Sequence, residues 1–246
     1  MKILFISLGC DKNLADSEEM LGLLTGNGHE IVDSEEEADA IVINTCCFIH
    51  DAKEESVNTI LEMAEYKKTG TCKILIVTGC MAQRYKEEIT EEIPEVDAVL
   101  GTTSYGDIVK ALNEAEAGHV FREFKDINAL PEDSGRRVIT TGGHFGYLKI
   151  AEGCDKHCTY CIIPSLRGKF RSVPEERLLK QAEYMASQGV RELILVAQET
   201  TVYGTDLYGK KTLHILLKKL CQIKGIRWIR VLYCYPEEIY DELIQT

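Results

Sequence analysis

The sequence predicts an α/β protein, with an N-terminal open parallel-sheet α/β domain followed by the first part of a β/α barrel. Short apolar runs alternate with segments of helical character over the first hundred residues, which is typical of an open parallel sheet covered on both faces. From about residue 144 a strand and helix pattern repeats in the manner of a barrel. We expect an N-terminal domain at 1–118, a connecting segment at 119–143 and a partial barrel at 144–246.

Each element of the N-terminal domain has its own signal. Apolar runs predict strands at residues 2–7, 40–44, 73–78 and 98–100, with a weaker one at 29–33. Asp16 followed by Glu19 resembles a capping box for a helix that runs toward Gly26, and Asp51 with Glu54 similarly begins a helix that ends near Gly70. Further helices are expected at residues 82–92 and 104–116.

The second half begins with a connection and then repeats one unit. The chain from about residue 117 to about residue 144 has the character of a connection, because residues 132–137 are charged and turn-rich and residues 140–143 read Thr-Thr-Gly-Gly. Strands are predicted at 146–151, 192–197 and 228–233, and helices at 174–188, 213–223 and 236–244. In such barrels the functional residues lie at the carboxyl ends of the strands.

Composition and charge limit the setting. The chain has 246 residues, 45% of them hydrophobic, which suffices for real cores. Its first apolar run, about six residues, is too short for a signal-peptide core or a membrane span, so a cytoplasmic protein is expected. Ten cysteines in that setting favour metal ligands and reduced thiols over disulfides. Residues 1–120 hold 9 Lys and Arg against 24 Asp and Glu, a net charge of -15, whereas the remainder carries +3. The acidic first half disfavours binding to nucleic acid.

One group of cysteines stands in a single loop. Cys154, Cys158 and Cys161 place three thiols within eight residues, directly after a predicted barrel strand and without a fourth cysteine beside them. A structural zinc site usually has four ligands. Three thiolates can instead hold a 4Fe-4S cluster and leave its fourth iron open to a substrate. His157 lies within this loop and could be a ligand, although a solvated loop histidine is the simpler interpretation.

A second group of cysteines follows three predicted strands. Cys10, Cys46 and Cys80 each come directly after one, 36 and 34 residues apart. Because the carboxyl ends of parallel strands share one edge of the sheet, these thiols are expected to converge on a second three-thiolate site. Gly9 and Gly79, just before two of them, suit a tight turn close to a ligand. Cys47 remains an alternative to Cys46, and the unplaced cysteines are interpreted as structural: Cys47, Cys72, Cys221 and Cys234.

These residues carry a resemblance to a known family. The Cys-x-x-x-Cys-x-x-Cys spacing, with Tyr160 just before its last cysteine, resembles the radical S-adenosylmethionine (SAM) superfamily. Together with the upstream triplet it resembles the methylthiotransferases over essentially the whole chain. Three segments look most similar to the RimO-type enzymes, which modify an aspartate of a small-subunit ribosomal protein: Ser-Leu-Gly-Cys-Asp-Lys-Asn at 7–13, Leu-Lys-Ile-Ala-Glu-Gly-Cys at 148–154 and Val-Ala-Gln-Glu-Thr-Thr at 196–201.

The resemblance implies a mechanism and its cofactors. The Cys154 triplet would hold a 4Fe-4S cluster whose open iron binds SAM, and one electron would cleave SAM to a 5'-deoxyadenosyl radical. The Cys10 triplet would hold a second 4Fe-4S cluster that carries the sulfur, and a second SAM would supply the methyl group. Tyr160 would pack near the SAM adenine and Gln198 is a candidate SAM contact. No general acid or base is expected.

Several nearby residues have two interpretations. Arg167, Lys169 and Arg171 could meet the SAM carboxylate or an anionic substrate, or could form a solvated basic loop. Asn13 and Asn44 could orient the second cluster through hydrogen bonds to sulfur, or could serve in turns.

The resemblance also implies partners and alternatives. The expected partners are a small-subunit ribosomal protein as substrate and an electron donor such as flavodoxin or ferredoxin, with no membrane and no direct nucleic-acid substrate. A tRNA methylthiotransferase is the first alternative, although its relatives usually have Gly-Cys-Gln-Met-Asn where this chain has Gly-Cys-Asp-Lys-Asn. An inactive metal-binding fragment is the second.

The sequence departs from the family pattern in two ways. Cys47 stands where a glycine is usual. The family's barrel has six units and is followed by a TRAM domain, whereas about three units are present here. We therefore expect a fragment whose last strand, near residues 228–233, has an unpaired edge.

Overall fold

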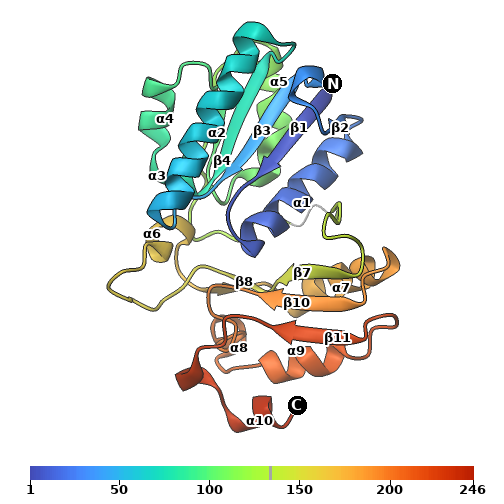
Figure 1. Cartoon of the computed structure of the whole chain (residues 1–246). Helices are drawn as coiled ribbons and strands as arrows, with labels where there is room; N and C mark the ends of the chain where they lie inside the picture. Colours follow the sequence, from blue (N-terminus) through green and yellow to red (C-terminus); the bar gives the residue numbers. More distant parts are fainter. Residues whose placement is uncertain (133–134) are drawn as a thin grey trace. The chain divides into compact units, whose positions relative to one another are not determined.

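The computed structural model describes residues 1–132 and 135–246 of the chain (Figure 1). It divides into two compact units, Met1–Val138 and Ile139–Thr246, and each is described by itself. Within the described residues, every helix is too short or too polar to cross a membrane.

The first unit is built on one parallel sheet of six strands (Figure 1). In spatial order the strands are β2 (Glu30–Val32), β1 (Lys2–Ser7), β3 (Ala40–Thr45), β4 (Ile74–Gly79), β5 (Ala98–Leu100) and β6 (Phe121–Glu123). Every residue of β3, β4 and β5 is buried, as expected for strands covered on both faces. From β1 the chain adds β2 on one side and then β3 to β6 on the other, so the strand order reverses between β1 and β3. The carboxyl ends of these two strands therefore flank a topological switch point, where open α/β sheets bind ligands.

Helices pack on this sheet through apolar residues at helical spacing. The helices are α1 (Asp11–Gly26), α2 (His50–Thr69), α3 (Cys80–Arg84), α4 (Lys86–Glu92) and α5 (Ile108–Glu116), with 3-10 turns η1 (Glu35–Glu37) and η2 (Tyr105–Asp107). Leu24 of α1 and Leu112 of α5 belong to one buried cluster with Ile3, Val42 and Ile76 of the sheet. In α5 the buried positions recur every three or four residues, which directs a single stripe toward the strands. Helix α2 packs against β3 and β4.

Three helix starts differ from the sequence-based predictions. Helix α1 begins at Asp11, not Asp16, because the chain turns directly from β1 into the helix with Cys10 as its N-cap residue. Asp16 is buried in the second turn, so the proposed capping box was wrong. The helix expected at 82–92 is two helices separated at Tyr85. The helix expected from 104 begins with the 3-10 turn η2.

Part of the expected connecting segment packs on the first unit. Residues 121–123 form strand β6 at the edge of the sheet. Further along, the Val138 amide donates to the Glu18 carbonyl at 3.0 Å. Arg137 donates from Nε and Nη2 to the buried Glu18 carboxylate at 2.8 and 2.5 Å. A Cβ at Gly22 would lie 2.7 Å from the backbone of Arg136, so this segment lies directly on α1.

The second unit contains three parallel strands in the order β11, β10, β7 (Figure 1). These are β7 (Phe145–Lys149), β10 (Glu192–Val196) and β11 (Trp228–Val231), and the short strands β8 (Ala151–Glu152) and β9 (Arg171–Ser172) form an antiparallel pair. The helices are α6 (Ile163–Arg167), α7 (Glu175–Ser187), α8 (Thr205–Tyr208), α9 (Leu213–Leu220) and α10 (Asp241–Ile244), with the 3-10 turn η3 (Pro236–Glu238). Parallel strands joined through α7 and α9 are the β/α units predicted for a partial barrel.

The edge of this sheet is exposed as expected. Strand β11 pairs with β10 alone among the described strands, and Trp228 is 61% exposed. The strand ends at Val231, two residues before its predicted end, and the helix expected at 236–244 is instead η3 followed by α10. Helices α6 and α8 were not expected. Both are short and lie within loops that follow strands.

Candidate metal centres

The first cysteine triplet lies at the carboxyl ends of three neighbouring strands. Cys10 follows β1 and is exposed, Cys46 follows β3, and Cys80 is the first residue of the helix after β4. Since β1, β3 and β4 are adjacent in the sheet, the three residues come from one edge, as predicted. The β1 and β3 members flank the switch point of the sheet.

Two glycines let the backbone approach these cysteines. Gly9 has φ +89°, and a Cβ there would lie 2.6 Å from Cys46 Cβ and 2.9 Å from Cys46 Sγ. The Cys46 side chain therefore lies against the turn that carries Cys10. Gly79 has φ +94° and its added Cβ would lie 2.3 Å from Asn44 Oδ1. Only glycine fits either turn without displacing its neighbours.

Asn13 and Asn44 tie the strand ends together. Asn13 Nδ2 donates to the carbonyls of Leu8 at 3.0 Å and Thr45 at 2.9 Å, and so links the turn after β1 to the end of β3. Asn44 Nδ2 donates to the Asn13 carbonyl at 2.9 Å. Asn13 Oδ1 also lies 3.8 Å from the thiol of Cys80. Both asparagines thus support the loops, and Asn13 additionally lies beside one predicted ligand.

Cys47 is buried beside Cys80. Its thiol donates to the Cys80 carbonyl at 3.3 Å, and the residue is 2% exposed. Burial raises the pKa of Cys47 to about 12. A buried thiol that is already hydrogen-bonded to backbone is typical of a structural cysteine. Cys46 stays the predicted ligand of the triplet, with Cys47 as its alternative.

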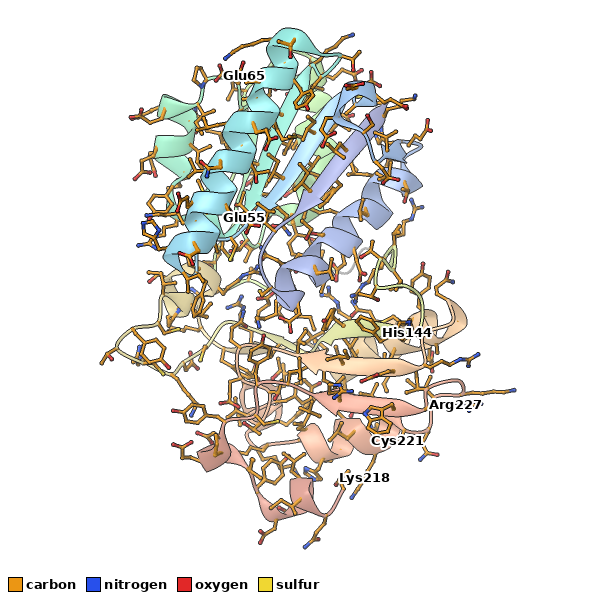
Figure 2. The ribbon with its side chains drawn as sticks, in the orientation of Figure 1. Glu55, Glu65, His144, Lys218, Cys221 and Arg227 are labelled. Carbon is orange, nitrogen blue, oxygen red and sulfur yellow. The ribbon has the colours of Figure 1, made fainter. Side chains whose placement is uncertain are left out.

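The other unplaced cysteines lie in different surroundings. Cys72 is buried and donates to the Ile74 carbonyl at 3.4 Å. Cys234 lies 3.5 Å from the Thr200 hydroxyl. Cys221 is exposed directly after α9 (Figure 2), so it is not the core residue that a structural interpretation suggests.

Hydrogen bonds between residues 151–155 and residues 168–172 hold together the two ends of the loop that carries the second triplet. Strands β8 and β9 pair Ala151 with Ser172 and Glu152 with Arg171. The Cys154 amide donates to the Gly168 carbonyl at 3.1 Å, and the Phe170 amide donates to Asp155 Oδ1 at 3.0 Å. A Cβ at Gly153 would lie 2.5 Å from the Gly168 carbonyl oxygen. The residues on either side of the loop are therefore held together.

The three cysteines of this loop are all partly exposed. Burial raises the pKa of Cys154, the Lys156 amide opposes this by donating to Cys154 Sγ at 3.4 Å, and the charges of Cys161 and Cys158 raise it further. Within the described ranges, no group of three or more His, Cys, Asp or Glu side chains is arranged to hold a single metal ion. A cubane makes no such demand, because each thiolate binds a different iron. Three accessible thiols, one already accepting an amide hydrogen bond, fit such a cluster.

A buried group of charges lies under the loop. Glu152 pairs with Lys149, and its Oε1 lies 3.5 Å from Arg167 Nη1. Burial alone would raise the pKa of Glu152, but the charges of Lys149, Arg167 and Arg171 outweigh it and lower the pKa to about 2. Arg167 is 3% exposed, so the interpretation of a solvated basic loop was wrong for this residue. Lys169 is exposed, which agrees with that interpretation.

Sequence reasoning missed Lys149 and Glu152. Their signal was present as two charged residues three apart within a strand that is otherwise apolar. Charges at buried positions need partners, so the pattern indicated an ion pair beside the cysteine loop.

The predicted SAM contacts differ in their surroundings. Gln198 follows β10, and its Oε1 is buried without a hydrogen-bond partner in the described part of the chain. An unpaired buried acceptor suits a ligand that brings a donor. Tyr160 is 85% exposed in the cysteine loop, and His157 is exposed as well. The two contacts stay predictions.

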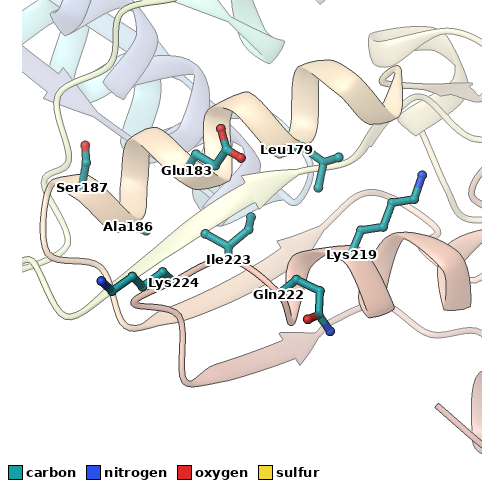
Figure 3. Close-up of a pocket in the computed structure, with 8 residues that line it drawn as sticks. All are labelled: Leu179, Glu183, Ala186, Ser187, Lys219, Gln222, Ile223 and Lys224. Carbon is teal, nitrogen blue, oxygen red and sulfur yellow. The ribbon is translucent and has the colours of Figure 1, made fainter.

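A groove of about 520 Å³ lies elsewhere in the second unit (Figure 3). It lies between α7 and α9 and is lined by Leu179, Glu183, Ala186, Ser187, Lys219, Gln222, Ile223 and Lys224. None of these residues belongs to the cysteine loop or to the end of β10. The groove is therefore separate from the predicted SAM site.

Two protein-family models match the chain. The uncharacterized protein family UPF0004 matches residues 2–101, and the radical SAM superfamily matches residues 148–245. The chain is 67% identical over 246 residues to "Ribosomal protein uS12 methylthiotransferase RimO" of Lachnoclostridium phytofermentans, covering 100% of this chain and 56% of that protein. It is 52% identical over 246 residues to the protein of the same name from Clostridioides difficile, covering 100% of this chain and 55% of that protein. The chain thus spans about half the length of these relatives.

Two solved structures of similar fold are named as radical SAM enzymes. The radical SAM methyltransferase TsrM from Kitasatospora setae, with cobalamin and a [4Fe-4S] cluster bound, matches with a TM-score of 0.62 and 11% identity over 99% of this chain and 56% of that one. The cobalamin-dependent SAM radical enzyme OxsB matches with a TM-score of 0.54 and 15% identity over 92% of this chain and 38% of that one. At such identities the likeness concerns the fold alone.

Proposed function

We propose that this chain is a radical SAM methylthiotransferase and that it serves to add a methylthio group to an aspartate side chain of ribosomal protein uS12. The observation that carries the proposal is the 67% identity, over all 246 residues, to a relative named for that activity. The relatives bear the name of a ribosomal-protein enzyme, which does not favour the tRNA alternative.

We propose that the two cysteine triplets hold two 4Fe-4S clusters. Cys10, Cys46 and Cys80 would bind one, and Cys154, Cys158 and Cys161 the other. When bound, the clusters and SAM supply one-electron chemistry and the sulfur and methyl group. The chain's own residues shape these sites: Gly9 and Gly79 allow the close turns of the first, and the Lys156 amide donates to a thiol of the second.

The SAM site would lie at the carboxyl ends of the barrel strands. Gln198 would accept a hydrogen bond there, since its Oε1 is buried and unpaired within the described residues. Tyr160, exposed in the cysteine loop, would cover the adenine. Arg167 would act mainly through Glu152, which it neutralises, rather than through free contact with SAM. A small redox protein such as flavodoxin or ferredoxin would supply electrons.

Mass spectrometry of uS12 tests the activity directly. In a bacterium that carries this gene, Cys80→Ser or Cys154→Ser at the chromosomal locus should abolish methylthiolation of the uS12 aspartate. Cys221→Ser is the matched control, because that thiol is exposed outside both triplets, and it should leave the modification intact. Unmodified tRNA adenosine with fully modified uS12 in the Cys→Ser strains would instead support a tRNA enzyme and refute the proposal.

Iron analysis tests the two clusters separately. After anaerobic reconstitution the protein should hold about eight irons, and replacing either triplet by serine should leave about four. Bound zinc without the absorption band near roughly 400 nm that thiolate-bound iron gives would indicate a metal-binding fragment. A count near four in the unaltered protein would refute the two-cluster proposal.

A further inference from the structure

Lys156 lies in the middle of the Cys154 loop and reaches residues far along the chain. Its Nζ lies 3.0 Å from Glu238 Oε1 and 3.8 Å from the centre of the Tyr235 ring. A longer ion pair of 3.9 Å joins it to Glu199 Oε2. A cation that contacts two carboxylates and an aromatic face is held in one place more firmly than a lysine in a single surface pair.

The partners of Lys156 are themselves fixed. Lys211 Nζ donates to the Glu238 carbonyl at 2.8 Å and lies 2.9 Å from Glu238 Oε2. The Glu199 side chain is 4% exposed and its Oε1 accepts from the Thr201 amide at 3.0 Å. The Thr200 hydroxyl donates to the Leu232 carbonyl at 2.8 Å, which ties the end of β10 to the end of β11. Lys156 therefore contacts residues that are held in place by other interactions.

The backbone of the same residue touches a predicted ligand. The Lys156 amide donates to Cys154 Sγ at 3.4 Å. Amide hydrogen bonds to sulfur are one of the means by which proteins set the reduction potential of an iron-sulfur cluster. The contacts that hold the Lys156 side chain in place therefore also hold its backbone amide against Cys154 Sγ.

We propose that Lys156 is a positioning residue, whose side chain clamps the cysteine loop to Tyr235 and Glu238 so that its own amide stays against Cys154 Sγ. The clamp joins the loop after the first barrel strand to the segment after the third. Its effect on a cluster rests on the proposed function, but the clamp itself exists in the chain without metal.

Hydrogen exchange of the metal-free protein tests the clamp. Lys156→Met should speed exchange of the amides at residues 155–161 by about tenfold, from loss of an ion pair and a cation–π contact. Lys156→Arg keeps the ion pair and the cation–π contact, so its exchange rates should stay near those of the unaltered protein. Lys180→Met on α7 is the matched control, because Lys180 is exposed outside this network. Unchanged exchange in Lys156→Met would overturn the proposal.

Coupling with the far partner makes the test sharper. If the residues act as one clamp, Glu238→Gln in the Lys156→Met background should add almost nothing to the exchange rate. Additive effects would overturn the clamp. In the reconstituted protein, Lys156→Met should lower the reduction potential of the Cys154 cluster, since it removes a positive charge and loosens a donor to sulfur. An unchanged potential would overturn the positioning role. Failure to bind iron at all would count against the proposed function while leaving the exchange result valid.

Discussion

Gly79→Ala should destabilise the first unit far more than an alanine at another glycine with a positive φ. Gly79 has φ +94° and ψ -158°, a backbone region that residues with a side chain almost never adopt. Its added Cβ would lie 2.3 Å from Asn44 Oδ1 and 2.5 Å from the Thr45 carbonyl oxygen. The backbone atom cannot move aside cheaply, because Thr45 is the last residue of the buried strand β3.

The magnitude follows from two separate costs. Backbone strain of this type costs roughly 1–3 kcal/mol. Forcing a methyl group into a packed site costs a further 1–3 kcal/mol or so. The sum, about 2–6 kcal/mol, is a large part of the roughly 5–15 kcal/mol by which domains are stable. Gly28 isolates the first cost, because it has φ +85° but an added Cβ would meet no atom within 4 Å. Gly28→Ala should therefore cost about 1–2 kcal/mol.

The assay compares the unaltered protein, Gly79→Ala and Gly28→Ala. Hydrogen exchange of the buried β3 and β4 amides gives the free energy of unfolding for the first unit alone, and urea unfolding followed by circular dichroism provides a second measure. The free energy of unfolding of Gly79→Ala should fall below that of Gly28→Ala by about 1–3 kcal/mol. Equal losses in the two variants would show that the close approach at Gly79 has no energetic consequence and would refute the reasoning.

Three further changes give distinct results. Arg137→Met should lower the free energy of unfolding of the first unit by about 3–5 kcal/mol, because it removes the guanidinium that pairs with the buried Glu18 carboxylate, and adding Glu18→Met should restore most of the loss in urea unfolding. Burial raises the pKa of Cys72, so the contribution of its neutral thiol to folding stability is complete below the unfolded pKa near 9.0 and is lost as pH rises above it. Cys72→Ala should therefore flatten the alkaline decline in the free energy of unfolding. Parallel stability curves for the variant and the unaltered protein from pH 8 to roughly pH 11 would contradict this. Gly153→Ala should speed hydrogen exchange in the cysteine loop, whereas Gly143→Ala, with φ +83° and open space, should not.

Local patterns were sufficient to predict most of the strands and the placing of the first triplet. Residues 2–7 form a strand with the predicted bounds, because a buried parallel strand is a short continuous apolar run with clear ends. The cysteines after β1, β3 and β4 share one edge for a reason of topology: parallel strands that are neighbours end on the same side. No knowledge of side-chain packing was needed for either inference.

What could not be predicted depends on contacts between distant residues. Asp16 resembled a cap because its spacing to Glu19 is that of a capping box, yet Glu19 instead accepts from the Tyr105 hydroxyl at 3.1 Å. Glu18 is paired with Arg137, 119 residues away. The contact of Lys156 with Glu238 spans 82 residues. Spacing along the chain carries no information on partners that only the folded protein brings together.

Three buried or half-buried ion pairs each hold a loop or connecting segment in place. Glu18 with Arg137 fixes a segment onto α1, Glu152 with Lys149 braces the start of the cysteine loop, and Lys156 with Glu238 holds its middle. The strands themselves are packed by apolar side chains. Because apolar contacts are non-directional and replacing a buried ion pair by apolar residues often leaves stability unchanged, these pairs are better explained by geometry than by stability. A loop that presents thiols at fixed positions needs directional contacts, and charged pairs supply them.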